Sequence, residues 1–343
     1  MKILVTGGTG YIGSHTVVEL LAKGYEVIIV DDLSNSSIEV LGNIEKITGK
    51  KPLFEQFNLT DTEKTGAFFR NNNTDIGGII HFAAFKAVGE SVEFPLKYYH
   101  NNLVSLINIL HGMKENTIRN IVFSSSCTVY GQPAILPVKE DAPLQKAWSP
   151  YGNTKQISED ILNDTSKVTD IQAILLRYFN PIGAHESTLI GELPLGEPNS
   201  LMPYITQTAI GKRPFLRVWG NDYDTPDGTA IRDYLHVTDL AKAHVIAVER
   251  MLNSKMKQKV EVFNLGTGNG FSVMQVIDSF ERSTGVRLNY QIMGRRAGDI
   301  EQVWADTDFA NKELGWTAEK NLDEMTLSAW KWEKVLAKEW APK

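Results

Sequence analysis

Short apolar runs alternate with longer amphipathic segments along the first half of the chain. The short runs, several of them rich in β-branched residues, are typical of buried strands, which we predict at 2–6, 26–30, 52–57, 78–83, 120–124 and 172–178. The longer segments repeat apolar residues at helical spacing and predict helices that include 11–22, 95–115 and 151–167. This alternation is typical of an α/β protein with a Rossmann-type doubly wound parallel sheet, covered on both faces.

The pattern changes after Asn180. Residues 181–199 combine glycine, proline and charge and predict an extended loop. Beyond it we predict helices at 201–210, 271–284 and 321–336, a strand at 216–219, and a strand at 262–265 that rejoins the first sheet. We therefore expect a nucleotide-binding domain made of 1–180 with about 236–265, capped by a smaller mixed α/β domain made of 181–235 and 266–343.

Composition argues against several classes of function. The 343 residues are enough for about two domains, and the formal net charge of -6 argues against non-specific binding to nucleic acid or anionic membranes. No apolar stretch reaches the length of a membrane span, and the first residues lead directly into a strand, with no room for a signal peptide. The single cysteine, Cys127, excludes an intramolecular disulfide and a cysteine-based zinc site. We expect a cytoplasmic protein without a metal.

The first predicted strand is followed by TGGTGYIG, which places Gly7, Gly10 and Gly13 between a strand and a helix. Glycine lets the backbone approach a pyrophosphate, and the helix N-terminus offers unpaired N–H groups and a positive dipole end. This context predicts dinucleotide binding. Asp31 and Asp32 follow the second strand, where a carboxylate accepts hydrogen bonds from ribose and favours NAD over NADP. Either aspartate suits that role, and we favour Asp31.

The segment SPYGNTK predicts a helix start, with Ser149 as N-cap and Pro150 at the first helical position. On such a helix Tyr151 and Lys155 lie one turn apart on the same face. To act as a base near neutral pH, the tyrosine needs its pKa lowered by ~3 units, which takes ~4 kcal/mol. A unit charge at ~4 Å with an effective dielectric of ~20 contributes about that much. Ser126, at the end of the fifth predicted strand, lies on the edge where such sheets bind ligands.

The order of these features, and segments along nearly the whole chain, resemble the UDP-glucose 4-epimerases, a branch of the extended short-chain dehydrogenase/reductase family. The matching segments include TGGTGYIGSH, HFAAFKAVGESV, FSSSCTVYG, SPYGNTK, LRYFNPIGAH, LMPYI and GRRAGD. The resemblance implies interconversion of UDP-galactose and UDP-glucose through a 4-keto sugar, with tightly held NAD. Tyr151 is then the base, and Ser126 is hydrogen-bonded to the reacting oxygen.

The resemblance also implies the residues of each site. The catalytic set is Ser126, Tyr151 and Lys155. The cofactor-binding set is Gly7, Gly10, Tyr11, Ile12, Gly13, Asp31, Asp32, Asn35, Asn58, Leu59, Phe82, Ala83, Lys86, Asn101, Ser126, Tyr151, Lys155 and Tyr178. The UDP-sugar set is Lys86, Ser126, Tyr151, Asn180, Ser200, Leu201, Val218, Trp219, Arg232, Arg296, Asp299 and Val303. The two arginines suit the diphosphate because guanidinium forks match phosphate geometry.

Some residues depart from the family pattern. Asn58 stands where an aspartate commonly reaches the adenine, and Ser200 where an asparagine often lies beside the diphosphate. Val303 occupies a place that some members fill with a bulky tyrosine, which predicts that N-acetylated UDP-sugars are also accepted. A sugar-nucleotide 4,6-dehydratase needs an Asp-Glu pair where this chain has Cys127 and Thr128. A reductase with exchangeable cofactor and a non-catalytic NAD-sensing protein stay open as alternatives.

The oligomeric state is not decided by the residues alone. Apolar positions along the helix predicted at 95–115 suit a partner helix or the core equally well: Leu96, Leu103, Leu106, Ile107 and Leu110. The resemblance implies a homodimer.

Overall fold

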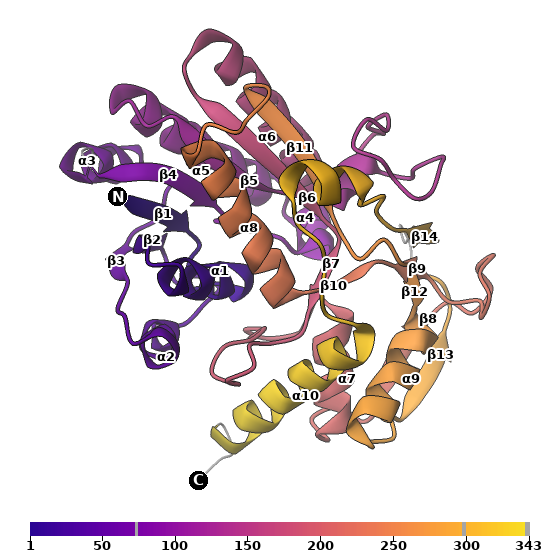
Figure 1. The fold of residues 1–343 in the computed structure, drawn as a ribbon. Coiled ribbons are helices and arrows are strands. Elements are labelled where there is room, and N and C mark those ends of the chain that lie inside the picture. The colour runs from indigo at the N-terminus through magenta and orange to yellow at the C-terminus, as the bar shows by residue number, and fades with distance from the viewer. Residues whose placement is uncertain (73–74, 297–299, 340–343) are drawn as a thin grey trace.

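A seven-stranded parallel sheet, with six strands from residues 1–180 and β11 from later in the chain, forms the centre of the first half of the structure (Figure 1). The computed structural model describes residues 1–72, 75–296 and 300–339. The strand order is β11-β6-β5-β4-β1-β2-β3. The bounds are β1 Lys2–Thr6, β2 Glu26–Asp31, β3 Leu53–Gln56, β4 Ile76–His81, β5 Asn120–Ser126, β6 Gln172–Tyr178 and β11 Val260–Leu265. This order confirms the predicted Rossmann-type sheet.

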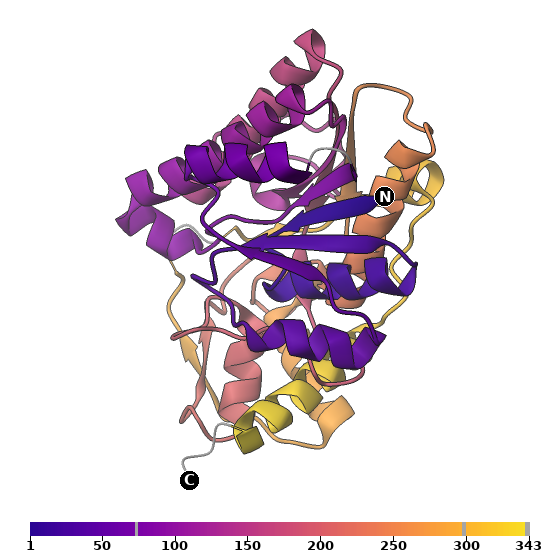
Figure 2. The same cartoon turned by 90° about the vertical axis from the view of Figure 1, so that its left-hand side faces the viewer.

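Helices cover both faces of this sheet, and Figure 2 shows the strands between the two helical layers. One layer contains α1 (Tyr11–Ala22), α2 (Glu39–Thr48) and α8 (Val237–Leu252). The other contains α3 (Thr62–Asn72), α5 (Pro95–Glu115) and α6 (Pro150–Val168). Neighbouring strand residues point to opposite layers: Ile3 packs in the first and Leu4 in the second. Burial on both faces explains why these strands are continuous apolar runs in the sequence.

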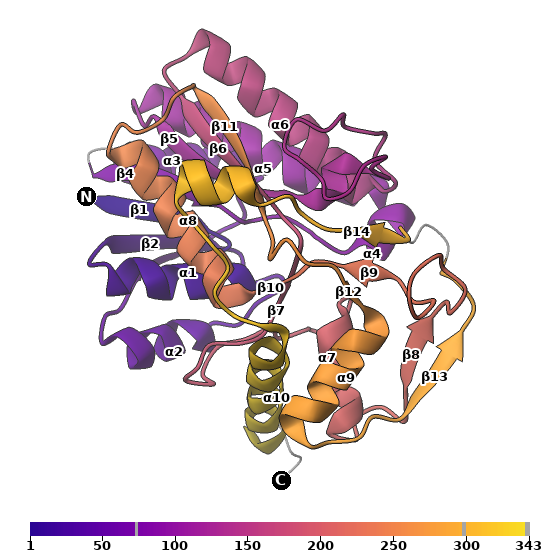
Figure 3. The same cartoon turned by 45° about the vertical axis from the view of Figure 1, so that its right-hand side comes forward.

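The second half of the structure, built from residues between β6 and α8 and from residues after β11, gathers three helices around a separate apolar cluster (Figure 3). These helices are α7 (Leu201–Ala209), α9 (Val273–Thr284) and α10 (Leu322–Glu339). Short strands complete this half: β7 Asn180–Ile182, β8 Leu216–Trp219, β9 Ile231–Arg232, β10 Tyr234–His236, β12 Phe271–Ser272, β13 Tyr290–Met293 and β14 Gln302–Val303. They form pairs β10-β7 and β13-β8 and a set β12-β9-β14. Within the described residues, no helix combines the length and apolarity needed to cross a membrane.

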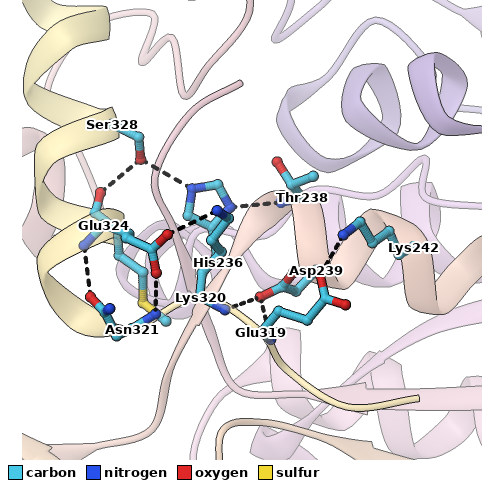
Figure 4. A network of polar contacts seen from close by, with 10 residues as sticks. His236, Thr238, Asp239, Lys242, Glu319, Lys320, Asn321, Glu324 and Ser328 are labelled. Atoms are coloured by element: carbon cyan, nitrogen blue, oxygen red, sulfur yellow. Dashed lines mark hydrogen bonds and ion pairs between the residues drawn. The ribbon is translucent and has the colours of Figure 1, made fainter. Parts of the chain in front are cut away.

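Polar contacts fasten α10 to the start of α8 (Figure 4). Nδ1 of His236 accepts a hydrogen bond from the backbone N–H of Thr238 at 3.1 Å and so caps α8. The neutral ring then carries its proton on Nε2, which lies 3.1 Å from Oγ of Ser328 on α10. Asp239 accepts two successive backbone N–H groups from the segment that leads into α10, at 3.0 and 2.9 Å. The neutral form of His236 is therefore part of the joint between the two halves.

The predicted elements are present, with differences at their ends. β5 continues to Ser126 because Ser125 and Ser126 pair with the last two residues of β6. The fourth strand begins earlier than predicted and ends at His81, since Phe82 and Ala83 leave the sheet and line a cavity. The strand predicted at 262–265 does rejoin the sheet, as β11 beside β6.

Candidate active site

A cavity of about 770 Å³ lies at the carboxyl ends of the central strands. It is lined by the loops after β1 and β4, by the ends of β5 and β6, and by residues of the second half. β1 lies between β2 and β4, so the cavity opens where the strand order reverses. Open α/β sheets bind their ligands at this switch point, and a volume of this order suits a cofactor or small-molecule site.

The glycine loop between β1 and α1 is closed to side chains. Gly7 has φ +70°, and a Cβ there would lie 2.8 Å from the backbone nitrogen of Ala83. A Cβ on Gly13 would lie 2.1 Å from the carbonyl oxygen of Gly7. No side chain in the described part of the protein caps α1, which begins after Gly10. Its first N–H groups and its dipole thus face the cavity, which suits a pyrophosphate.

Both aspartates at the end of β2 line the cavity. Oδ2 of Asp31 accepts the N–H of Thr9 at 3.2 Å, so this carboxylate is tied to the glycine loop. Oδ2 of Asp32 accepts instead from Nδ2 of Asn58 at 2.8 Å. Oδ1 of Asn58 accepts from Thr60, so the amide is oriented on both sides. Of the two carboxylates, that of Asp31 contacts the glycine loop, and its role toward a ribose stays a prediction.

The helix start at SPYGNTK has the predicted geometry. Oγ of Ser149 accepts the N–H of Gly152 at 3.1 Å and caps α6, with proline in the first turn. Tyr151 lies in that turn, and its ring centroid is 5.8 Å from Nζ of Lys155. Nζ itself donates to the carbonyl oxygen of Ser124 at 2.6 Å. The cap therefore fixes where the tyrosine points, and the strand end fixes the lysine.

Burial dominates the charges of this pair. It raises the pKa of Tyr151 to about 12, while a hydrogen bond with Ser126 acts in the opposite direction. It lowers the pKa of Lys155 to about 7, and the nearby charge of Glu159 acts against that change. The ammonium of Lys155 favours phenolate, as the sequence predicts, whereas desolvation, which the sequence does not report, has the opposite sign and is the largest cause of the change in the pKa of Tyr151. A positive charge bound in the cavity would favour the phenolate of Tyr151.

The far wall of the cavity comes from the second half. Arg232 and Arg296 line it, and Nη1 of Arg232 donates to the backbone oxygen of Ile231 at 2.8 Å. The neighbouring Arg295 does not line it, and pairs with Asp222 on the surface at 2.8 Å. Two cations on one wall suit a diphosphate. Among the described residues, no group of three or more His, Cys, Asp or Glu is placed to hold a metal ion.

The loop between β7 and α7 is tied to the first half at three points. Tyr11 Oη donates to the carbonyl oxygen of Gly183 at 2.6 Å. Nδ2 of Asn43 donates to the carbonyl oxygen of residue 189 at 3.0 Å. Lys86 forms an ion pair of 3.4 Å with Glu192, which also accepts from Ser200. This loop therefore closes one side of the cavity over the glycine loop.

Comparison with known proteins places the chain in a family. The family model described as GDP-mannose 4,6 dehydratase matches residues 4–328. A UDP-glucose 4-epimerase from Dictyostelium discoideum is 50% identical over 335 residues, which cover 97% of this chain and 96% of the relative. The chain belongs to the UDP-glucose 4-epimerase family of extended short-chain dehydrogenases/reductases. The broader family model includes dehydratases, but Cys127 and Thr128 lack the acid–base groups that elimination needs.

Solved members of the epimerase family have the same fold. A UDP-glucose-4-epimerase from Stenotrophomonas maltophila, with bound NAD and formylated UDP-arabinopyranose, is 45% identical with a TM-score of 0.95. That alignment covers 99% of each chain. A UDP-glucose 4-epimerase from Bifidobacterium longum, in complex with NAD+ and UDP, is 46% identical with a TM-score of 0.93 and 98% coverage of each chain.

The cavity brings together all the residues predicted for the catalytic and cofactor sets. Of the UDP-sugar set, two residues do not line it: Val218 lies in the apolar cluster of the second half, and Val303 is buried with Tyr130 and Phe179. Asp299 lies outside the described residues. The remaining UDP-sugar residues do line the cavity, namely Lys86, Ser126, Tyr151, Asn180, Ser200, Leu201, Trp219, Arg232 and Arg296. The roles of all these residues stay predictions.

Two buried charged residues behind the cavity were missed by the sequence reasoning. Glu159 and Arg177 form an ion pair of 2.6 Å. Glu159 continues the row of Tyr151 and Lys155 at a further helical turn, so its spacing was a usable signal. Arg177 interrupts an apolar strand directly before Tyr178, and a charge in such a position requires a buried partner.

Proposed function

We propose that this protein interconverts UDP-galactose and UDP-glucose in an NAD-dependent reaction at C4 of the sugar. The observation that carries the proposal is one cavity that is lined by a glycine loop at an uncapped helix start, a Tyr-x-x-x-Lys pair, and two arginines from the second half. The family relationship supports it. The glycine loop suits the pyrophosphate of a dinucleotide, since Cβ atoms at Gly7 and Gly13 would collide with the backbone of Ala83 and of Gly7, so that glycines allow this tight turn before the helix start.

The residues divide the work between binding and proton transfer. The glycine loop and Asp31 hold the pyrophosphate and the ribose of NAD, which supplies a reversible hydride acceptor and the positive charge that favours phenolate. Tyr151 accepts the proton of the C4 hydroxyl as this carbon becomes a ketone, and returns the proton when the ketone is reduced. Ser126 donates a hydrogen bond to the same oxygen. Arg232 and Arg296 hold the diphosphate, so the 4-keto sugar turns while the nucleotide stays anchored.

The decisive experiment is incubation of the purified protein with UDP-galactose, without added NAD. The expected product is UDP-glucose, with NAD remaining on the protein through gel filtration. Loss of NAD on the column, with activity only when the cofactor is added back, would favour a reductase. Bound NAD without conversion of UDP-galactose would favour a non-catalytic NAD-sensing protein.

We also propose that N-acetylated UDP-sugars are accepted. Val303 on β14 lies opposite Arg232 on β9 in the parallel pairing, and its side chain is smaller than the tyrosine that some members carry. Its burial beside Phe179 means that a larger residue has to push into the neighbouring cavity wall. Assays with UDP-N-acetylglucosamine and UDP-N-acetylgalactosamine test this proposal. Val303→Tyr should lose that activity and keep activity toward UDP-galactose, and a parent without N-acetyl turnover would contradict it.

We further propose that the protein is a homodimer. We also propose that it works in the cytoplasm, a reducing compartment. Leu106 and Leu110 of α5 are buried in the core of their own chain, whereas Leu96 is 82% exposed and Phe94 is 55% exposed. The exposed end of α5 is thus the part that suits a second copy. Light scattering after gel filtration measures the state, and Leu96→Glu should convert a dimer to a monomer. The division into a nucleotide-binding and a UDP-sugar-binding domain, with the bounds predicted above, is part of the same proposal.

A further inference from the structure

A buried ion pair lies directly behind the catalytic residues. The side chains of Glu159 on α6 and Arg177 on β6 are only 3% and 6% exposed. Arg177 donates from Nε to Oε1 at 3.0 Å and from Nη2 to Oε2 at 2.6 Å. This two-point contact holds the carboxylate in one orientation and places a guanidinium charge beside it in a buried position.

Glu159 also reaches the strand end that carries Ser126. Its Oε1 accepts a hydrogen bond from Oγ of Ser125 at 2.5 Å. Ser125 lies between Ser126 and Ser124, whose carbonyl oxygen accepts from Lys155 Nζ. Glu159 therefore holds Ser125, and Lys155 holds the neighbouring Ser124, directly before Ser126.

The charge of Glu159 acts on Lys155. The two residues are one helical turn apart on the same face of α6. Lys155 donates to a neutral carbonyl, and the Glu159 carboxylate opposes the fall in its pKa that burial causes. Buried titratable groups on the elements packed around Lys155 include His81 on β4, Tyr98 on α5, Cys127 after β5, Tyr151 on α6, and Arg177 and Tyr178 on β6. Near neutral pH only Arg177 among these is charged, and it is paired with Glu159 itself.

We propose that Glu159 is a positioning residue for the proton transfer, acting through Lys155 and Ser125. The inference rests on the proposed function, because it concerns the same tyrosine. The carboxylate anchors the strand end that presents Ser126, and its charge keeps Lys155 protonated beside Tyr151. Arg177 holds the carboxylate with two hydrogen bonds, so the ion pair and the catalytic residues form one connected unit.

Glu159→Gln tests the charge with almost no change in shape. Without the carboxylate, Lys155 loses its proton at a lower pH. The fall of kcat/KM on the alkaline side of its pH profile (the alkaline limb) reports the loss of this proton, so that fall should begin at a lower pH. We expect a shift of about one pH unit or more. At a pH above the limb this corresponds to a loss of about tenfold or more in kcat/KM. Glu159→Asp, which keeps the charge, should restore the limb toward that of the parent.

The chain offers a matched control in a second buried pair. Arg250 on α8 donates to both oxygens of Glu261 on β11, at 2.6 and 3.0 Å, and the two side chains are 10% and 6% exposed. Neither residue lines the cavity. Glu261→Gln should therefore lower the stability as Glu159→Gln does and leave the pH limb unchanged. A limb that moves equally in both variants would overturn the proposal.

A second measurement needs no turnover. The pKa of Lys155 is followed by NMR on protein with isotopically labelled lysine, with Lys155→Met to assign its signal, and it should fall in Glu159→Gln. If that variant does not fold, the double change Glu159→Gln with Arg177→Gln leaves no orphaned charge and should show a smaller fall, because loss of the Arg177 charge acts in the opposite direction. Folded protein with an unchanged pKa of Lys155 and an unmoved limb would overturn the proposal. A parent without epimerase activity would instead refute the proposed function, and the titration would still decide the role of Glu159.

Discussion

Acidification should cost this protein much of its stability, because four buried histidines are neutral in the fold. Burial lowers the pKa of His15 and His81 to about 3, and that of His236 and His244 to about 4. In the unfolded chain each imidazole takes up its proton near pH 6.5. Protons therefore bind the unfolded state first as the pH falls from about 6.5 toward 4, and folding loses free energy throughout that range.

The size of the effect follows from these values. Between pH 7 and pH 5 each histidine removes about 2 kcal/mol from the free energy of unfolding, or about 8 kcal/mol together. Buried carboxyl groups act in the opposite direction because burial raises their pKa: that of Asp233 rises to about 6, which offsets about 1 kcal/mol. Burial also raises the pKa of Glu140 and Asp239. The histidines and Asp233 together leave a loss of about 7 kcal/mol, which the two other carboxyl groups reduce, and a loss of this order is comparable with the whole stability of many domains.

Urea unfolding at pH 7 and pH 5, followed by circular dichroism, measures the loss. His236→Asn provides an internal test, because asparagine also caps a helix through its side-chain oxygen and does not titrate. The loss between the two pH values should then be smaller by about 2 kcal/mol. Equal stability of the parent at both pH values would refute the reasoning. So would a His236→Asn variant that is as sensitive to acid as the parent.

Three substitutions test the site. Tyr151→Phe should lower kcat by about 10³-fold and leave the melting temperature unchanged, and a rate within tenfold of the parent would exclude Tyr151 as the base. Gly13→Ala places a Cβ 2.1 Å from a carbonyl oxygen, so the purified variant should lack bound NAD, whereas Gly42→Ala, which meets nothing within 4 Å, should retain it. Retention of NAD by both variants would contradict the pyrophosphate site. Arg232→Met should raise KM for UDP-galactose at least about tenfold, and an unchanged KM would remove this arginine from the diphosphate site.

Local signals were sufficient for the elements around the glycine loop. β1 and α1 have the predicted bounds, 2–6 and 11–22, because a β-branched run, a glycine turn and an apolar helix each leave a mark within a few residues. The helix at SPYGNTK was equally clear, since Ser149 and Pro150 are cap signals by their chemistry. The residues of the cofactor set came from motif resemblance, and the cavity brings them together.

Tertiary burial explains what the sequence did not show. Phe82 and Ala83 continue an apolar run, yet they line the cavity, because apolar character does not distinguish a sheet from a ligand site. Burial raises the pKa of Tyr151, and the spacing of residues along the sequence does not show how deeply a side chain is buried. The ion pair of Glu159 and Arg177 joins residues that are far apart along the chain, so only the fold could show that they meet.

The elements α8 and β11 complete the central sheet but come late in the sequence, and this order has a consequence for synthesis of the chain. A nascent chain that ends near residue 180 exposes the outer edge of β6 and one apolar face that α8 later covers. Free strand edges and bare apolar faces are the features that make partly made proteins aggregate. Residues 1–180 expressed alone should therefore be insoluble or dependent on chaperones. The cavity lies between the two halves, but a chain that is truncated at this boundary lacks α8 and β11 and so cannot complete its central sheet.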